Sequence, residues 1–284
     1  MKKVLIGLIG AGIQRSLSPA LHEEEARHHG LRLHYQLIDL DTPGVGPEVL
    51  PELVSSARVM GFAGLNITFP CKQSVIALLD SLSEEASAIG AVNTVVREGN
   101  RLVGYNTDGS GWSWGFKRAL PGADLSRIVL LGAGGAGSAC ADAVLRLGAE
   151  QLSVVDQDAA RAAGLAARLN EQFTGNRAIA VQEIATAIKG ASGLIHATPT
   201  GMLKIPGMPL PASLLRPSLW VSEVVYVPLE TELLKAARRI GCATVDGGHM
   251  NVGQAARAFK LFTGQDADAR RMEAHFRKLV SEGA

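Results

Sequence analysis

Short segments rich in β-branched and other apolar residues alternate with longer amphipathic segments along most of the chain. This alternation predicts strands separated by helices, as in α/β folds whose sheets are largely parallel. In the first hundred residues it predicts helices at 19–29, 47–60 and 71–82, and strands at 4–9, 33–40, 62–67, 91–96 and 102–105.

A second series of apolar segments begins after the turn Pro121–Asp124, which is the clearest break between the two halves. This series predicts strands at 128–131, 152–155, 178–181, 194–197, 219–225 and 243–245. A helix is expected at 139–147, and two more, at 252–262 and 267–280, end the chain. Gly264 follows the first of these two, in the position where a left-handed residue often ends a helix.

Charge and composition exclude several classes of protein. The 284 residues include 28 Lys and Arg against 27 Asp and Glu, so the basic surface that attracts nucleic acids or anionic membranes is missing. The apolar run Val4–Ile13 follows two lysines but ends without a cleavage pattern, which indicates a strand and not a signal peptide. No segment approaches the ~18 apolar residues of a membrane span. The isolated cysteines Cys71, Cys140 and Cys242 favour neither a disulfide framework nor a zinc site, and we expect a cytoplasmic protein.

Residues 128–137 combine an apolar strand, a glycine-rich turn and the start of a helix. Gly132, Gly134 and Gly137 match the pattern G-x-G-x-x-G. The first glycine of this pattern makes a tight turn, the second lets the backbone approach a pyrophosphate, and the third lets helix and strand pack closely. The N–H groups at the helix start favour phosphate. We therefore predict dinucleotide binding, with a glycine turn that holds no ligand as the alternative.

Asp156, at the end of the next predicted strand, bears on the choice of dinucleotide. A carboxylate there can accept hydrogen bonds from the adenosine ribose hydroxyls of NAD. It would repel a 2′-phosphate by about 4 kcal/mol at ~4 Å and an effective dielectric constant of about 20. Gln157 and Asp158 follow in place of a cation, and Arg161 falls inside the next helix. The sequence therefore favours NAD over NADP.

Clusters of small polar residues lie at strand ends in the first half of the chain. Ser16 and Ser18 precede a helix that begins with proline, an arrangement that suits a bound carboxylate but also an ordinary N-cap. Asn66 and Thr68 are two residues apart on a strand and share one face. Lys72 is expected in the first turn of a helix, where it opposes the helix dipole and so indicates a function. The remaining clusters are Asn93-Thr94 and Asn106-Thr107-Asp108-Gly109, in which Asp108 could be only an N-cap.

Eight short motifs, in order over nearly the whole chain, resemble those of shikimate dehydrogenases. They are S-x-S-P from Ser16, G-x-N-x-T-x-P-x-K from Gly64, G-A-x-N-T from Gly90, G-x-N-T-D-G from Gly104, G-x-G-G-A from Gly132, A-T-P-x-G-M from Ala197, V-Y-x-P from Val225 and G-G-x-M-x-x-x-Q-A from Gly247. The set is highly specific.

The resemblance implies a two-domain α/β enzyme. An N-terminal substrate domain at 1–108 would be followed by a Rossmann-type NAD-binding domain at 109–246, and C-terminal helices at 247–284 would return to complete the first domain. Lys72 and Asp108 would form the catalytic pair, and Ser16 and Ser18 would hold the substrate carboxylate. Further substrate contacts would come from Asn66, Thr68, Asn93, Asp108, Tyr226 and Gln254. The cofactor would be held by Gly132, Ala133, Gly134, Gly135, Ala136, Asp156, Thr198, Pro199, Gly201 and Met202.

Several positions depart from the family pattern. Asp156-Gln157-Asp158 replaces the Asn-Arg-Thr/Ser signature of NADP-using members, Glu23 stands where many members have Asn, Glu223 replaces the usual Asp, and Glu232 replaces a common Pro. These departures point to the NAD-using quinate/shikimate dehydrogenase branch, or to a relative that acts on a modified shikimate.

A lysine beside a carboxylate suits the oxidation of a secondary alcohol. As hydride leaves carbon, the lysine can accept the hydroxyl proton, and it can return a proton in the reverse direction. A cationic lysine also stabilises negative charge on the carbonyl oxygen during reduction. The alternative is a Lys72–Asp108 salt bridge without chemistry.

Two rival chemistries have weaker support. The segment Gly111–Gly115 matches the G-x-S-x-G elbow of serine hydrolases around Ser113, but polar residues precede it and its tryptophans indicate an amphipathic helix. The histidines His22, His28, His29 and His34 lack metal-binding spacing, so a surface helix face is favoured and no metal is expected.

We therefore expect an NAD-dependent dehydrogenase that reversibly oxidises a ring hydroxyl of shikimate, quinate or both. Its partner would be a small cyclic hydroxy acid, and the protein would be a monomer or homodimer. Alternatives are a member acting on an amino-substituted shikimate, an NADP-dependent biosynthetic enzyme, and a non-catalytic NAD-binding regulatory protein. Retention of Lys72 and Asp108 argues against the last.

Overall fold

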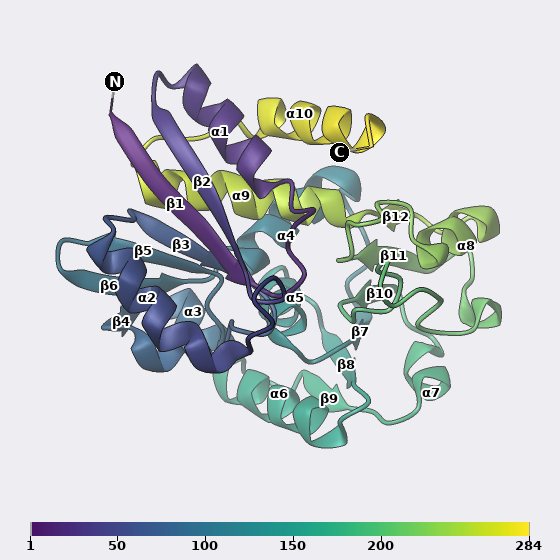
Figure 1. Ribbon diagram of the computed structural model, residues 1–284. Coiled ribbons are helices and arrows are strands. Elements are labelled where there is room, and N and C mark those ends of the chain that lie inside the picture. Colours follow the sequence, from purple (N-terminus) through teal and green to yellow (C-terminus); the bar gives the residue numbers. More distant parts are fainter. Residues whose placement is uncertain (1, 284) are drawn as a thin grey trace. The chain divides into compact units, whose positions relative to one another are not determined.

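The computed structural model describes residues 2–283 and has α/β architecture throughout (Figure 1). The chain forms two compact units: unit 1 contains the residues up to Thr107 and from Gln254 onward, and unit 2 contains Asp108–Gly253. The turn Pro121–Asp124 lies inside unit 2 and is not the boundary that the sequence suggested. The helix before the turn, α4 (Asp108–Ala119), packs against another helix of unit 2, α5 (Gly135–Arg146), and so belongs with it.

Unit 1 contains a six-stranded mixed sheet with the order β2-β1-β3-β5-β6-β4. Its strands are β1 (Lys3–Gly10), β2 (Arg32–Asp39), β3 (Gly64–Ile67), β4 (Ser81–Leu82), β5 (Thr94–Glu98) and β6 (Arg101–Tyr105). β1 pairs in parallel with β2 and β3, whereas β5 runs antiparallel to β3 and β6. The two-residue turn at 99–100, in which Gly99 has a φ of 64°, joins β5 and β6 as a hairpin.

The helical segments of unit 1 agree with the sequence prediction except at residues 71–89. They are α1 (Ser18–His28), the 3-10 helix η1 (Pro47–Val49), α2 (Leu50–Val59), the 3-10 helix η2 (Ser74–Leu78), α3 (Glu84–Ile89), the second part of α9 (Gly247–Thr263) and α10 (Ala269–Ser281). Gly264 follows α9 with a φ of 78°, as predicted.

The predicted helix at 71–82 is wrong. This segment forms only η2 and the short strand β4. The Asp80 N–H donates to the Leu102 carbonyl oxygen, and the Asp80 carboxylate accepts from the Leu102 N–H. These bonds hold the segment beside β6, where residues 81–82 pair with β6 as strand β4. The unpredicted helix α3 then begins at a Ser83 cap and ends at Gly90, which has a φ of 69°.

Both faces of the unit 1 sheet are covered, which explains the almost continuous apolar run of β1. Ile6 and Leu8 belong to a buried cluster that includes Phe262 of α9. Ile9 belongs to another cluster, which includes Val54 of α2. Because side chains alternate across a strand, β1 must be apolar on both sides.

Unit 2 contains a six-stranded, entirely parallel sheet with the order β12-β11-β10-β7-β8-β9. Its strands are β7 (Arg127–Leu131), β8 (Gln151–Val155), β9 (Ala178–Ala180), β10 (Gly193–His196), β11 (Trp220–Glu223) and β12 (Thr244–Val245). Besides α4 and α5, its helices are α6 (Ala159–Gln172), α7 (Ile184–Ile188), the 3-10 helix η3 (Ala212–Leu214), α8 (Glu232–Ile240) and the first part of α9. This is the doubly wound order of a dinucleotide-binding domain, as the sequence predicted.

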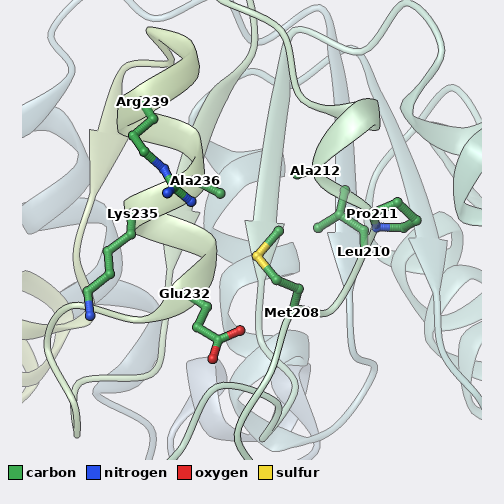
Figure 2. A pocket seen from close by; sticks show the side chains of 8 residues that line it. All are labelled: Met208, Leu210, Pro211, Ala212, Glu232, Lys235, Ala236 and Arg239. Carbon is green, nitrogen blue, oxygen red and sulfur yellow. The ribbon is translucent and has the colours of Figure 1, made fainter.

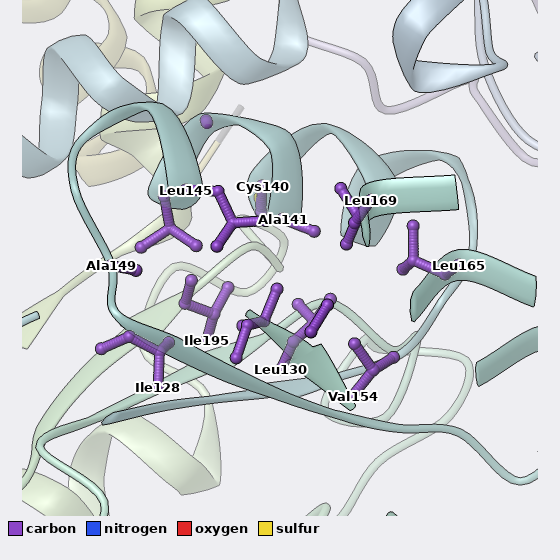
Figure 3. Close-up of a cluster of buried hydrophobic side chains, with 14 of the residues drawn as sticks. Ile128, Leu130, Cys140, Ala141, Leu145, Ala149, Val154, Leu165, Leu169 and Ile195 are labelled. Carbon is purple, nitrogen blue, oxygen red and sulfur yellow. The ribbon is translucent and has the colours of Figure 1, made fainter. Parts of the chain in front are cut away.

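The core of unit 2 fixes the strand that leads into the glycine-rich turn. Figure 3 shows Ile128 and Leu130 of β7 pointing toward Leu145 of α5 and Leu165 of α6 within one apolar cluster. All four side chains are almost completely buried. No helix within residues 2–283 is long and apolar enough to cross a membrane.

Candidate active site

The glycine-rich turn after β7 has the geometry that the sequence predicted. Gly132 adopts a φ of 100°, which disfavours other residue types, and its N–H donates to the Val155 carbonyl oxygen at 2.8 Å. A Cβ at Gly137 would overlap the Gly132 carbonyl oxygen, so helix α5 can lie this close to the turn only with glycine there. A Cβ at Gly134 would meet no other atom within 4 Å. The turn is therefore tight on its inner side and open at Gly134, as pyrophosphate binding requires.

The surroundings of this turn also fit a dinucleotide. Gly134 is the N-cap of α5 and supplies no side-chain cap, so the N–H groups of the first helical turn remain available to an anion. β7 lies between β8 and β10, where the strand order reverses, and ligands of open α/β sheets bind beyond the strand ends at this point. Ala133, Gly135 and Ala136 belong to the same loop and helix start.

Asp156 directly follows β8 and is held by the backbone. Its Oδ2 accepts a hydrogen bond from the Ala133 N–H at 2.7 Å, and its Oδ1 accepts from the Asp158 N–H at 2.9 Å. The carboxylate is therefore fixed against the glycine-rich turn. Asp158 in turn caps α6 and pairs with Arg161, whose Nε lies 3.3 Å from Asp158 Oδ2.

In unit 1, Asn66 forms the centre of a buried polar network. Its Oδ1 accepts from the Tyr35 hydroxyl at 2.8 Å, while its Nδ2 donates to the Asn93 carbonyl oxygen at 3.2 Å and to Thr94 Oγ1 at 3.0 Å. Both hydrogens of Nδ2 are thereby used inside the unit. A ligand hydroxyl could only donate to the second lone pair of Oδ1.

The predicted residues Asn93 and Gln254 come together through Thr107. Asn93 Oδ1 accepts from the Thr107 N–H at 2.8 Å, and Asn93 Nδ2 donates to Thr107 Oγ1 at 2.9 Å. Thr107 Oγ1 lies 3.5 Å from Gln254 Oε1, which links the end of β6 to α9. Thr68, also predicted, follows β3 and donates its N–H to the Ile9 carbonyl oxygen.

Ser16 and Ser18 lie at the start of α1. The Ser16 hydroxyl accepts from the Ser18 N–H at 3.3 Å, but no side chain caps the helix itself. The ordinary N-cap alternative is therefore not what these serines form. Ser18 is buried, and Ser16 is half-buried.

Lys72 lies in a turn and not in the first turn of a helix, so the argument from the helix dipole was wrong. The Cys71 N–H donates to the Thr68 carbonyl oxygen and closes this turn before η2 begins. The Lys72 carbonyl oxygen accepts from the Val92 N–H at 2.8 Å, which ties the turn to the segment that carries Asn93. Asp108 is buried as the first residue of α4 and of unit 2.

The loop after β10 contains the other predicted cofactor residues. Thr198 is half-buried and Pro199 is exposed. Gly201 has a φ of 96° and donates its N–H to the Ile205 carbonyl oxygen, and the Met202 side chain is 41% exposed. Tyr226, predicted to contact substrate, is half-buried in the loop after β11.

Sequence reasoning did not single out His196, which ends β10. Its Nδ1 lies 2.8 Å from Glu223 Oε1, and its Nε2 lies 2.5 Å from Thr198 Oγ1. Both ionisable side chains are completely buried. The sequence contained one signal that could have identified this pair: a histidine at the end of an apolar strand, together with Glu223 in place of the usual Asp.

His22 is not on a surface helix face, contrary to the sequence prediction. It is buried against Tyr35, Phe259 and Phe262, and burial lowers its pKa to about 3 although the Glu25 carboxylate opposes this shift. Within residues 2–283, no cluster of three or more His, Cys, Asp or Glu side chains could hold a metal ion.

Ser113 lies within α4, so the segment Gly111–Gly115 is no strand-to-helix elbow. Its neighbour Trp112 stacks on Phe116 and donates its indole N–H to the Ser222 hydroxyl at 2.9 Å. The amphipathic-helix interpretation is confirmed.

A separate hollow of about 380 Å³ lies between α8 and the segment around η3 (Figure 2). Met208 and Leu210 face Glu232 across it. No residue predicted to bind cofactor or substrate lines this hollow.

Comparison with known proteins gives consistent matches over nearly the full length. The family model described as "Shikimate dehydrogenase substrate binding domain" matches residues 8–95, and the one described as "Shikimate 5'-dehydrogenase C-terminal domain" matches residues 250–275. A shikimate dehydrogenase (NADP(+)) of Streptomyces avermitilis is 57% identical and aligns with 99% of this chain and 97% of its own.

NAD-named relatives are similar as well. A quinate/shikimate dehydrogenase (NAD(+)) of Corynebacterium efficiens is 46% identical over 97% of this chain and 98% of its own. The solved structure of a quinate dehydrogenase from Corynebacterium glutamicum in complex with NAD superposes with a TM-score of 0.91 at 43% identity, covering 98% of this chain and 100% of the other.

Proposed function

Because the chain belongs to the shikimate dehydrogenase family, we propose that it is an NAD-dependent enzyme that reversibly oxidises a ring hydroxyl of shikimate, quinate or both to the 3-dehydro acid. The family relationship carries the oxidoreductase activity. The choice of cofactor and of acid rests on residues of this chain.

The preference for NAD is supported by one observation above all, the anchoring of Asp156. Each carboxylate oxygen accepts one backbone N–H and keeps lone pairs for the two ribose hydroxyls of NAD. The same anchoring opposes rotation of the charge away from a 2′-phosphate. Arg161 is the cationic residue nearest to Asp156 in the sequence. It pairs with Asp158, so the Asp158 carboxylate partly neutralises the positive charge that a 2′-phosphate would need.

We assign the chemistry to this chain's residues as follows. Lys72 accepts the proton of the reacting hydroxyl and returns it in the reverse direction, and Asp108 supports the charge of Lys72. Asn66, Thr68, Asn93 and Gln254 hold the ring hydroxyls. When bound, NAD supplies the hydride acceptor.

Ser16 and Ser18 would hold the carboxylate of the acid. Quinate carries an additional hydroxyl on the ring carbon beside its carboxylate, and a small serine at position 18 leaves room and a hydrogen-bond partner for it. An unpaired buried hydroxyl would cost about 1–3 kcal/mol, or roughly one to two orders of magnitude in kcat/KM. We therefore expect turnover of both acids.

The test is a panel of shikimate, quinate and an amino-substituted shikimate, each assayed with NAD and NADP by the absorbance of the reduced cofactor. We expect both unmodified acids to react, with at least about a tenfold preference for NAD, which corresponds to ~1.4 kcal/mol. Undetectable quinate turnover beside good shikimate turnover would contradict the dual-substrate proposal. Reaction of the amino-substituted acid alone would assign a modified shikimate as substrate.

The similar NADP-named relative makes an NADP-dependent shikimate dehydrogenase the second candidate. Equal or higher kcat/KM with NADP in the same panel would favour it. Such a result would leave the family and the reaction unchanged and would reject only the argument from Asp156.

A further inference from the structure

Glu223 is a buried carboxylate that accepts hydrogen bonds on both of its oxygens. Its Oε1 accepts from the N–H groups of Val224 and Val225 at 2.9 and 3.0 Å, and its Oε2 accepts from the Thr231 hydroxyl at 2.9 Å. The Thr231 hydroxyl oxygen itself accepts from the Leu234 N–H, which directs its hydrogen toward Glu223. Glu223 therefore acts only as an acceptor, as an ionised carboxylate does.

This arrangement fixes the tautomer of His196. Because Glu223 Oε1 already accepts two backbone N–H groups, the 2.8 Å contact with His196 Nδ1 must carry its proton on the nitrogen. A neutral imidazole protonated on Nδ1 has a lone pair on Nε2. In the neutral form that we propose below, this lone pair lies 2.5 Å from Thr198 Oγ1 and accepts the hydroxyl hydrogen of Thr198.

The polarity of the Thr198 hydroxyl is then determined. Its hydrogen points to the buried His196, and the oxygen keeps lone pairs for other groups, one of which faces the Thr200 N–H at 3.4 Å. Thr198 is half-buried, whereas His196 is inaccessible. A ligand beside this loop would therefore find an acceptor at Thr198 and no donor.

Thr198 also lies at the correct place for the second half of a dinucleotide. A Cβ at Gly132 would come within 3.1 Å of Thr198 Cγ2, so Thr198 adjoins the glycine-rich turn. Asp156 follows β8 on one side of β7, whereas Thr198 follows β10 on the other. Since a dinucleotide spans this reversal of strand order with its adenosine half over β8, its nicotinamide half lies over β10.

We propose that His196 and Glu223 are positioning residues that make Thr198 an obligate acceptor for an N–H of the nicotinamide carboxamide. This inference rests on the proposed function only in requiring a nicotinamide dinucleotide. It does not depend on the 2′-substituent, because NAD and NADP share the carboxamide. It also assigns a role to Glu223, whose side chain is longer than the usual Asp and reaches the imidazole.

Binding of two reduced dinucleotides tests the proposal without turnover. NADH carries a carboxamide with N–H donors, whereas the reduced 3-acetylpyridine analogue carries an acetyl group without them. We expect wild type to bind NADH more tightly than the analogue, and Thr198→Val to reduce the ratio of dissociation constants by about fivefold, as loss of one hydrogen bond predicts. Thr198→Ser should keep the ratio. Thr200→Val, the same change two residues away, serves as the matched control.

His196→Leu should reduce the ratio by a similar factor although Thr198 is retained. An unchanged ratio in Thr198→Val would overturn the acceptor role, and an unchanged ratio in His196→Leu would show that the buried pair only supports the fold. If His196→Leu does not fold, the ¹⁵N spectrum of the wild-type imidazole decides: a proton on Nδ1 alone supports the proposal, and a proton on Nε2, with or without one on Nδ1, contradicts it.

The same titrations separate this inference from the proposed function. Failure of wild type to bind any nicotinamide dinucleotide would reject both. Tight binding of NADH or NADPH without discrimination against the acetyl analogue would reject this inference alone.

Discussion

The two units carry their candidate binding residues in different chemical forms. In unit 1 the polar groups are side chains that hydrogen-bond to one another, as Asn66 does with Tyr35 and Thr94. In unit 2 the glycine-rich turn offers backbone N–H groups, and one side chain, Asp156, is fixed by two of the backbone amides around it.

This difference teaches which substitutions should affect which ligand. A side-chain network recognises a particular arrangement of hydroxyls, and each member can be removed separately. A backbone cradle recognises any pyrophosphate and is damaged only where a new Cβ changes the path of the chain. Substitutions in the side-chain network of unit 1 should therefore act on the acid, and substitutions in the glycine-rich turn of unit 2 should act on the cofactor.

The largest expected effect is on the chemical step. Lys72→Ala should lower kcat by about 100-fold or more, the range for loss of a general acid or base, while the dissociation constant of NAD changes little. Steady-state kinetics and a calorimetric titration of NAD measure the two quantities. Lys260→Ala, an exposed lysine of unit 1 that pairs with Asp266, should leave both unchanged. Near-normal kcat in Lys72→Ala would show that Lys72 only positions the substrate.

Gly132→Ala should damage the cradle and weaken NAD binding by about tenfold or more. The new Cβ would lie 2.7 Å from the Ala197 carbonyl oxygen in addition to the strain of a φ of 100°. Gly148→Ala is the matched control, since its φ of 103° carries the same strain but its Cβ meets no atom within 4 Å. Gly148→Ala should lose about 1 kcal/mol of stability and Gly132→Ala at least as much, but only Gly132→Ala should lose affinity for NAD. Equal affinities would contradict the cradle.

A smaller effect should appear in the acid stability of unit 1, through His22. In the unfolded chain His22 binds a proton below about pH 6.5, whereas in the folded protein burial lowers its pKa to about 3. Stability therefore falls as the pH drops from 6.5 towards 3, by about 2 kcal/mol between pH 7.5 and pH 5.

His22→Phe should remove this part of the pH dependence, because phenylalanine does not titrate. Thermal unfolding at pH 7.5 and pH 5 measures the difference. His28→Phe, an exposed histidine of the same helix, should keep the wild-type dependence. Equal slopes in wild type and His22→Phe would contradict the assignment to His22.

The fold was largely predictable because apolar periodicity reports burial directly. The parallel strands of unit 2 are short apolar runs between helices, and the structure confirms them. The segment at 71–82 failed because its conformation depends on Asp80 pairing with Leu102, a contact between residues distant in sequence. Local helix-forming preference cannot report such a contact.

The candidate sites show the same contrast between features that depend on local sequence and features that depend on contacts between distant residues. The glycine-rich turn depends on local spacing, so Gly132, Gly134 and Gly137 could be identified and their geometry agrees. The connection of Asn93 to Gln254 through Thr107 joins residues far apart in sequence and was not predictable from motifs. His196 was missed because its meaning depends on Glu223, a residue of the neighbouring strand.

The most direct test of the central claim, that Asp156 makes this family member NAD-dependent, is the ratio of kcat/KM with NAD to kcat/KM with NADP in wild type and Asp156→Asn. Asp158→Asn, which removes a charge two residues away and can still cap α6, is the control. We predict a ratio of at least about ten in wild type and Asp158→Asn, and a fall of about tenfold in Asp156→Asn, within the ~4 kcal/mol that one close repulsion can supply. Equal kcat/KM for the two cofactors in wild type, or a ratio unchanged by Asp156→Asn, would contradict the account.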